Sequence, residues 1–356
     1  MILRTIIALT LFSQTMPVNA SDDFKILRVT SSNPANIRID FKVDNPTNKV
    51  RPIRMGEYFI ETMDVEKIKI TENNLPLSLS EGGMAQIGGC TECSINLIHL
   101  TFDYSGSVRS QHDNLINSAR NFLNNIMGSS GRTLVRLSLF AGDKALYAFK
   151  GRYNDYLKPA DLLDKLLTSS CSEFTLDGSN ISSNLCESDT ATRLNRSILN
   201  NIESLNSAKE DFSKQTRNIN SASIIFTDGM GRDLDVNAST VAGEIDSLKK
   251  SGGLFYVVAV KSDEQNKKFF KKLNPSKKFE LRNMSKLSNT LVKVFDEMHA
   301  RLPYYFTLKI CSAVRGGVSS LGLSSRKYKI PKASFDIDAT DFSGGCDMKN
   351  SSQWRF

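Results

Sequence analysis

The chain has 356 residues, of which 40% are hydrophobic and 24% are charged, so it is neither a wholly disordered nor a low-complexity protein. Lysine and arginine outnumber aspartate and glutamate by 46 to 38, a net charge of +8, and three histidines leave few places for histidine-based catalysis or a histidine-ligated metal. At about 150 residues per domain, this length predicts two or three domains.

The first 20 residues have the pattern of a cleavable signal peptide. Arg4 gives a positive start, an apolar stretch covers residues 5–12, and small residues precede a cleavage point after Ala20. The apolar stretch is shorter than the roughly 20 residues that a membrane anchor needs. We therefore expect a secreted, periplasmic or cell-surface protein whose mature chain has no transmembrane segment.

Two regions, residues 21–93 and 302–356, are predicted to be rich in β-structure. Alternating apolar and polar residues predict strands over residues 37–43, 65–70, 304–310 and 335–339. Neither region is large enough for a comfortable core by itself. Either the two regions pack together as one β-sandwich, with the middle of the chain inserted between them, or they form two small independent units.

The middle of the chain, residues 94–301, alternates strand-like and helix-like patterns. Apolar runs predict buried parallel strands over residues 95–102, 134–140, 224–226 and 254–260. Helical spacing of apolar residues predicts helices around residues 115–126, 194–205, 241–248 and 287–298. Gly142 and Asp143 predict a hairpin that adds one antiparallel edge strand. The predicted fold class is α/β, a doubly wound and mostly parallel sheet, with β-rich, sandwich-like flanks.

Oxygen-bearing side chains follow the predicted strands, at the edge where doubly wound sheets bind ligands. One strand runs into Asp103-Tyr104-Ser105-Gly106-Ser107, a later one runs into Thr227-Asp228-Gly229, and Asp189-Thr190-Ala191-Thr192 precedes a helix. Each piece alone is more typical of a turn or a helix cap. Together, carboxylates and hydroxyls without histidine or cysteine suit Mg²⁺, Mn²⁺ or Ca²⁺ rather than zinc.

These residues resemble the metal-ion-dependent adhesion site of the von Willebrand factor A (VWA) domain family. That site is written D-x-S-x-S, then a threonine, then an aspartate before a glycine. Asp103, Ser105 and Ser107 match the first part, and Asp228 matches the last. The resemblance covers about residues 94–301. It implies a VWA-like, Rossmann-like fold that holds Mg²⁺ through the hydroxyls and, directly or through water, the aspartates.

The threonine of the site has two candidates. The family tends to show an apolar residue two positions after the threonine and a small residue five positions after it. Thr192 fits this spacing with Leu194 and Ser197, and Thr190 is the alternative. The resemblance further implies that an acidic side chain of a protein partner completes the metal's ligands, and that the protein is a binding or adhesion module rather than an enzyme.

Six cysteines in an exported chain predict three disulfides. Proximity in the sequence pairs Cys171 with Cys186, Cys311 with Cys346, and Cys90 with Cys93. The C-x-x-C motif could instead be redox-active, but such motifs usually begin a helix, and a strand-like run follows this one.

The segment Thr168–Ser188 is longer and more polar than the VWA pattern requires. With a disulfide between Cys171 and Cys186, it would form either a loop over the metal face that shapes partner choice or a tolerated surface insertion.

A run of lysines lies between residues 267 and 278, with no acidic residue inside it: Lys267, Lys268, Lys271, Lys272, Lys277 and Lys278. Phe269, Phe270 and Leu273 interleave at helical spacing, which predicts an amphipathic helix with a solvated lysine face. The alternative is attraction to an anionic surface such as lipid headgroups or polysaccharide. We expect no nucleic-acid partner, because the chain carries no recognisable nucleic-acid-binding motif.

The leading functional hypothesis is exported, divalent-metal-dependent protein binding. The alternatives are a metal-dependent hydrolase and a C-x-x-C redox helper in the secretory or periplasmic compartment. A phosphoryl-transfer site with an aspartyl nucleophile typically begins D-x-D, and Ser105 stands where the second acid would be. A Ser-His-Asp hydrolase needs a histidine near a nucleophile, whereas His99 is expected inside a strand and His112 inside the following helix.

Overall fold

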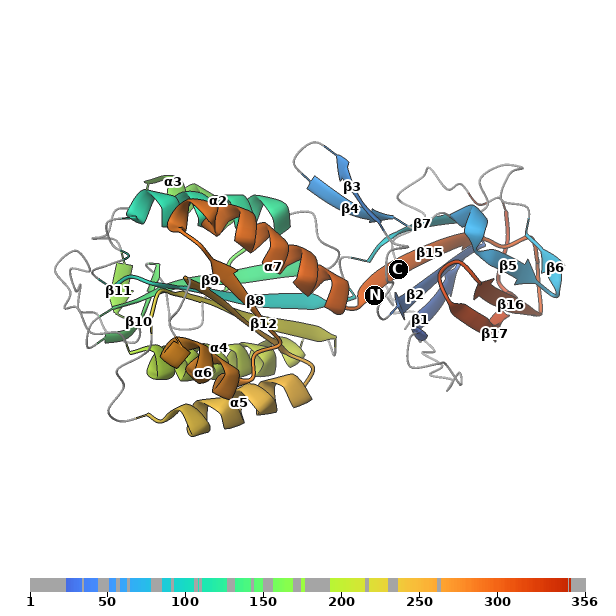
Figure 1. The fold of residues 1–356 in the computed structure, drawn as a ribbon. Helices are drawn as coiled ribbons and strands as arrows, with labels where there is room; N and C mark the ends of the chain where they lie inside the picture. Colours follow the sequence, from blue (N-terminus) through green and yellow to red (C-terminus); the bar gives the residue numbers. More distant parts are fainter. Residues whose placement is uncertain are drawn as a thin grey trace, which may run out of the picture. The chain divides into compact units, whose positions relative to one another are not determined.

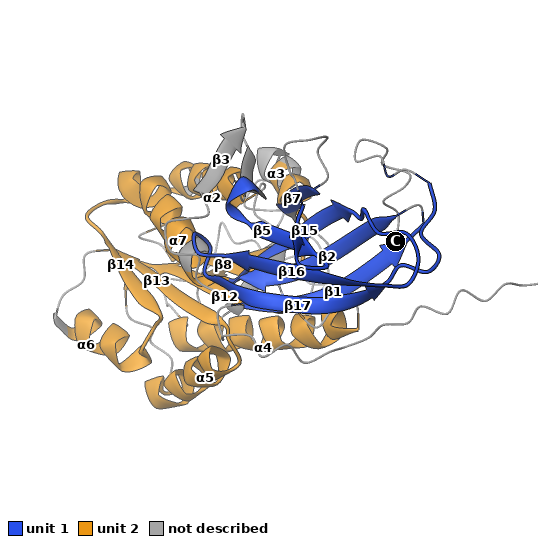
Figure 2. Ribbon diagram, turned by 90° about the vertical axis from the view of Figure 1, so that its right-hand side faces the viewer, with its two compact units in different colours: residues 1–51, 62–90, 303–356 blue, residues 52–61, 91–302 orange. Residues whose placement is uncertain are grey.

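A computed structural model describes part of the chain and divides it into two compact units. The described residues are 24–33, 35–43, 51–55, 58–62, 65–77, 85–90, 93–105, 108, 111–126, 132–141, 144–149, 156–168, 174–176, 193–214, 218–229, 236–260, 264–344 and 346. Unit 1 comprises residues 1–51, 62–90 and 303–356, and unit 2 comprises residues 52–61 and 91–302 (Figure 2). The predicted signal peptide lies outside the described residues.

Unit 2 is built around a seven-stranded sheet with the order β11-β10-β9-β8-β12-β13-β14. Its strands are β8 (Ile95–Asp103), β9 (Arg132–Ala141), β10 (Lys144–Phe149), β11 (Phe174–Leu176), β12 (Ile219–Thr227), β13 (Leu254–Val260) and β14 (Lys277–Leu281). The five strands β9, β8, β12, β13 and β14 are parallel, whereas β10 and β11 each pair antiparallel with their neighbour. Every residue of β8 is buried, including the polar Asn96, His99 and Thr101 among its apolar residues.

Helices cover both faces of this sheet (Figure 1). One face carries α2 (His112–Ile126), α3 (Pro159–Thr168) and α7 (Leu287–Arg301), and the other carries α4 (Leu194–Ser213), α5 (Ala238–Lys250) and α6 (Glu264–Leu273). The apolar residues that predict α2, α4, α5 and α7 are buried against the sheet. A short 3₁₀ helix, η4 (Met284–Lys286), precedes α7. The predicted fold class, a doubly wound and mostly parallel α/β sheet with β-rich flanks, is confirmed.

The edge of this sheet differs from the prediction. The antiparallel strand β10 is present, but β11 lies outside it and forms the edge. β11 belongs to the polar segment Thr168–Ser188, which the sequence predicts as a loop or an insertion. Its three residues pair Phe174 with Phe149 and Leu176 with Tyr147. Three residues are too few for a visible alternation of apolar and polar positions, so pairing with β10 decides this strand.

Unit 1 contains two antiparallel sheets that share one core. The first has the order β1 (Phe24–Ser32), β2 (Asn36–Val43), β15 (Tyr304–Cys311) and β7 (Ala85–Gly89), and the second has the order β17 (Ile330–Asp338), β16 (Val318–Ser325), β5 (Lys69–Glu72) and β6 (Leu75–Pro76). A single hydrophobic cluster includes inward side chains of both sheets, as in a β-sandwich. In the first sheet, β15 pairs with β2 and with β7, and in the second sheet β16 pairs with β5. Both sheets therefore combine strands from the N-terminal and the C-terminal regions of the chain.

Local details of unit 1 correct several predictions. Val65 begins a 3₁₀ helix, η1 (Val65–Lys67), instead of a strand, and β1 and β16 are strands that the alternation does not predict. Two further strands, β3 (Arg51–Met55) and β4 (Tyr58–Thr62), form a separate two-stranded sheet. Gly316 and Gly317, with φ of 79° and 74°, lie in the connection that leads from β15 into β16.

Candidate metal centre

Asp103 and Asp228 lie at the carboxyl ends of two neighbouring parallel strands. β8 ends at Asp103, and Asp228 directly follows the last residue of β12. The two strands pair up to Phe102 and Phe226, so the next residues, Asp103 and Thr227, lie beside each other. Both aspartates therefore lie at the carboxyl ends of the parallel strands, where the sequence predicts a ligand site.

Hydrogen bonds from Ser105 and Thr227 hold the Asp103 carboxylate. The Ser105 backbone N–H donates to Oδ1 over 2.9 Å, and the Thr227 hydroxyl donates to Oδ2 over 2.8 Å. Asp103 and Thr227 are 0% exposed and Ser105 is 4% exposed. The carboxylate is therefore buried among polar groups at the ends of β8 and β12, and these hydrogen bonds fix its orientation.

The charge of Asp103 is poorly compensated. Burial raises the pKa of Asp103 from its ordinary value of 3.8 to about 6, and the nearby Asp228 carboxylate adds to the rise. The hydrogen bonds from Ser105 and Thr227 act in the opposite direction. Within the described part of the chain, no lysine or arginine forms an ion pair with Asp103. A cation at this edge would offset the repulsion between the two carboxylates.

Thr227 is a residue of this site that the sequence reasoning does not single out. Its hydroxyl contacts Asp103 and also lies 3.1 Å from the carbonyl oxygen of Gly229, at the turn that follows β12. Thr227 thus links the two aspartate-bearing strand ends. The signal available in the sequence is its place directly before Asp228, in a Thr-Asp-Gly run at the end of an apolar strand.

Helix α4 begins near the carboxyl ends of the strands and runs antiparallel to β8. Near the end of β8, the Thr101 hydroxyl donates to Oδ1 of Asn201 over 3.1 Å, and farther along the helix Leu205 packs in a cluster with Ile95 at the start of β8. Because α4 and β8 run in opposite directions, the first residue of α4, Leu194, lies toward the carboxyl edge of the strands. The predicted ligand Thr192 precedes this helix start by two residues.

The structure describes three of the five predicted metal ligands. Asp103, Ser105 and Asp228 are gathered at the ends of β8 and β12. Ser107 and Thr192 lie outside the described residues, as does the alternative Thr190.

A buried histidine and serine lie beneath α4. His99 Nε2 is 2.8 Å from the Ser138 hydroxyl oxygen, the separation of a nucleophile and its base, but both side chains are 0% exposed and no substrate can reach them. Burial, assisted by the Arg136 charge, holds the pKa of His99 well below its ordinary value. His99 is therefore a neutral, hydrogen-bonded core residue, and this pair does not support the hydrolase alternative. His112 begins α2, as predicted.

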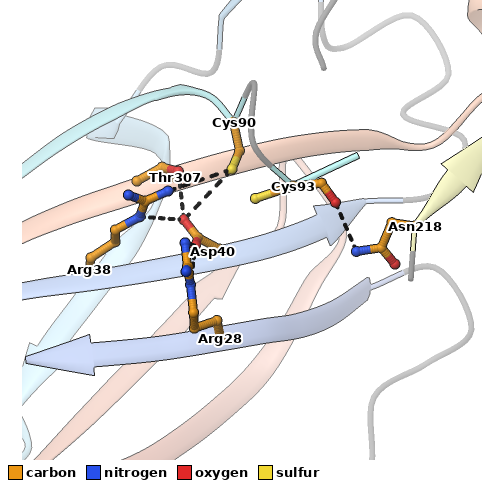
Figure 3. A network of polar contacts seen from close by, with 7 residues as sticks. All are labelled: Arg28, Arg38, Asp40, Cys90, Cys93, Asn218 and Thr307. Atoms are coloured by element: carbon orange, nitrogen blue, oxygen red, sulfur yellow. Dashed lines mark hydrogen bonds and ion pairs between the residues drawn. The ribbon is translucent and has the colours of Figure 1, made fainter. Parts of the chain in front are cut away.

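Cys90 and Cys93 do not offer thiolates for a metal site. Cys90 and Cys93 both form disulfides, so neither holds a thiolate for a metal or for redox attack. Near Cys90, the Asp40 carboxylate is already bound by Arg28 at 2.6 Å and by Arg38 at 2.9 Å (Figure 3). The same figure shows the Cys93 carbonyl accepting a hydrogen bond from Asn218; both residues belong to unit 2.

Of the other two predicted disulfides, the structure describes one. Cys311 and Cys346 form the predicted disulfide, with Cα atoms 5.6 Å apart. Cys171 and Cys186 lie outside the described residues.

No protein-family model and no curated protein matches the chain. Among solved structures, it is similar to proximal thread matrix protein 1 from the mussel byssus, with 17% identity, a TM-score of 0.38, and coverage of 62% of this chain and 49% of that one. It is also similar to the pilus adhesin SpaC from Lactobacillus rhamnosus GG, with 9% identity, a TM-score of 0.39, and coverage of 94% and 49%. A third similar structure is the manganese-loaded TRAP protein of Plasmodium vivax, with 13% identity, a TM-score of 0.40, and coverage of 74% and 98%.

These likenesses are remote. All three TM-scores are below 0.5, so the fold assignment rests on the strand order and packing of this chain itself. The chain spans about half the length of the mussel protein and of the pilus adhesin, at 49% each. Among the described helices, none is both long enough and apolar enough to cross a bilayer.

Proposed function

We propose that this protein is an exported binding module that recognises an acidic side chain of a protein partner through a divalent cation, most simply Mg²⁺. The metal ligands in this proposal are Asp103, Ser105, Ser107, Thr192 and Asp228, with Mn²⁺ or Ca²⁺ as the other candidate ions. The observation that carries the proposal is the meeting of two carboxylates, one fully buried, at the ends of the adjacent strands β8 and β12.

The donor set fits a hard divalent cation. Carboxylate and hydroxyl oxygens are the ligands that Mg²⁺, Mn²⁺ and Ca²⁺ take, and the set contains no sulfur or imidazole. Burial and the nearby Asp228 carboxylate raise the pKa of Asp103, and a bound cation would act in the opposite direction. Two aspartates and three neutral hydroxyls contribute a charge of about −2. A bound divalent ion would therefore keep enough electrophilic character to attract a further carboxylate.

The surrounding residues prepare the site. Ser105 and Thr227 fix the Asp103 carboxylate through hydrogen bonds, so little conformational freedom remains to be lost on binding. Tyr104 is tied to the neighbouring strand β9 by its backbone N–H, which donates to the carbonyl of Phe140 over 2.8 Å. The part of the site formed by β8 and β12 thus rests on the sheet itself, which favours a rigid recognition surface.

Calorimetric titration with Mg²⁺ and Mn²⁺ tests the proposal. The wild-type protein should bind one ion with measurable heat, and Asp103→Asn should show none. Asp113→Asn, an exposed acid in the first turn of α2, removes the same charge and should leave metal binding unchanged. Equal heats from the wild-type protein and Asp103→Asn would contradict the metal site. Partner capture from surface extracts that survives chelation would contradict metal-dependent binding.

A further inference from the structure

We infer that one side of unit 2, separate from the proposed metal centre, binds an acidic polysaccharide through lysines of α5 and α6. This basic face consists of Lys250, Lys267, Lys268, Lys271 and Lys272, all of them exposed. α5 and α6 pack against each other on the side of the sheet that α4 also covers (Figures 1 and 2). The inference does not depend on the metal-dependent function.

The four lysines of α6 form an ordered stripe within the basic face. Lys267 with Lys271, and Lys268 with Lys272, are separated by one turn of α6, about 6 Å along the axis. Phe270 and Leu273 on the opposite side are 1% and 0% exposed, which fixes the rotation of the helix and turns the lysines toward solvent. The ends of α5 and α6 are joined by Lys249, whose ammonium donates to the Asn274 carbonyl over 3.0 Å.

Only four of the six lysines in the run between residues 267 and 278 belong to α6. α6 ends at Leu273, and Lys277 and Lys278 belong to β14, where they form ion pairs with Glu297 and Glu280. Within the described residues, no carboxylate pairs with Lys250, Lys268, Lys271 or Lys272. The available charge is therefore concentrated on α6 and the end of α5.

Helix stability alone accounts for only part of this arrangement. Lysines in the last turn of α6 interact favourably with the helix dipole, which explains Lys271 and Lys272. Lys268 lies in the first half of the helix, where the dipole gives no such benefit. Lysines one turn apart also repel each other. A polyanion would remove this repulsion along the whole stripe.

A polysaccharide fits this face better than a membrane does. A helix that lies on a bilayer inserts an apolar face between the lipids. The apolar face of α6 is already buried in the core of unit 2. Within the described residues, the exposed large hydrophobic side chains are Leu75 and Val318, and both belong to unit 1. The face therefore offers positive charge without an apolar anchor, which suits a chain of repeating sulfate or carboxylate groups.

Binding of soluble heparin by the full chain, measured in low salt with chelator present, tests the inference. Lys268→Gln/Lys272→Gln should weaken binding about tenfold, and the remaining binding should depend less on salt concentration. The matched control is Lys286→Gln/Lys293→Gln, which removes the same charge from exposed positions on η4 and α7 and should change affinity by less than about twofold.

Several outcomes would overturn the inference. They are no heparin binding by the wild-type protein, equal losses in the two double variants, and heparin binding that requires a divalent cation. The last outcome would move the contact to the proposed metal centre. Binding to phosphatidylglycerol vesicles without binding to heparin would assign the face to membranes instead. Loss of metal binding in Asp103→Asn with heparin binding intact would separate the two functions.

Discussion

Replacing Asp103 with asparagine tests the electrostatics of the candidate site in the absence of metal. In the folded protein the pKa of Asp103 rises from 3.8 to about 6. Between about pH 4 and pH 6 the folded state thus keeps a proton that the unfolded state has released, so the stability contribution of this group falls as the pH rises. At about 1.4 kcal/mol for each pH unit, the complete loss is about 3 kcal/mol.

Asparagine is the right replacement because it removes the charge and keeps the shape. Its side-chain oxygen can still accept the Ser105 N–H, and the Thr227 hydroxyl retains an acceptor in the Gly229 carbonyl, 3.1 Å away. Alanine would instead leave the Ser105 N–H without its acceptor in a buried place, which adds a separate cost.

The assay is urea unfolding of the wild-type protein and Asp103→Asn in chelator at a series of pH values. The free energy of unfolding of the variant minus that of the wild type should grow by about 3 kcal/mol from about pH 4 to about pH 7. The difference is needed because His99, neutral when folded, destabilises both proteins as the pH falls below about 6.5. Added Mg²⁺ should stabilise only the wild type. A difference that stays constant with pH would refute the reasoning.

Three further changes test other parts of the structure. Thr227→Val removes the hydroxyl that holds Asp103 and should weaken Mg²⁺ binding about tenfold by calorimetry; unchanged affinity would exclude a positioning role. The buried Glu72 carboxylate accepts hydrogen bonds from the Ala313 backbone N–H and the Ser319 hydroxyl. Glu72→Gln replaces one of its oxygens with an NH₂ group and should lower the free energy of unfolding in urea by about 2 kcal/mol; a neutral effect would contradict this account. Cys311→Ser/Cys346→Ser opens a 35-residue loop and should cost at most about 4 kcal/mol; thermal unfolding equal to that of the wild type would show that the disulfide adds no stability.

The α/β unit is largely predictable because its core elements are patterned along the chain. β13 is buried on both faces and is therefore a continuous apolar run, and β8, which is also buried throughout, is mostly apolar. α2 and α7 bury one side only and therefore repeat apolar residues every three or four positions. The edge strands β11 and β14 carry no such pattern. β14 begins with two lysines, and parallel pairing with β13 makes it a strand.

In the candidate site, the sequence itself determines which oxygen-bearing residues follow the strands. Asp103 directly follows Phe102, and Asp228 follows Phe226 with only Thr227 between them, so both aspartates stand where an apolar stretch ends. What Thr227 does follows only from the register of β8 against β12, which brings its hydroxyl to a carboxylate 124 positions earlier in the chain. The raised pKa of Asp103 likewise needs burial and a second charge nearby, and neither can be read from its neighbours in sequence.

The β-rich flanks show the same division more strongly. Alternation along β2 and β15 determines that each is a strand with one inward face. That the two strands are neighbours is decided by tertiary structure: the Thr307 hydroxyl donates to Asp40 over 2.6 Å, across 267 positions. An alternating pattern indicates which side chains of a strand are buried, but it does not indicate which other strand pairs with it. Partner choice comes from the fit of whole faces, and that fit exists only in the folded chain.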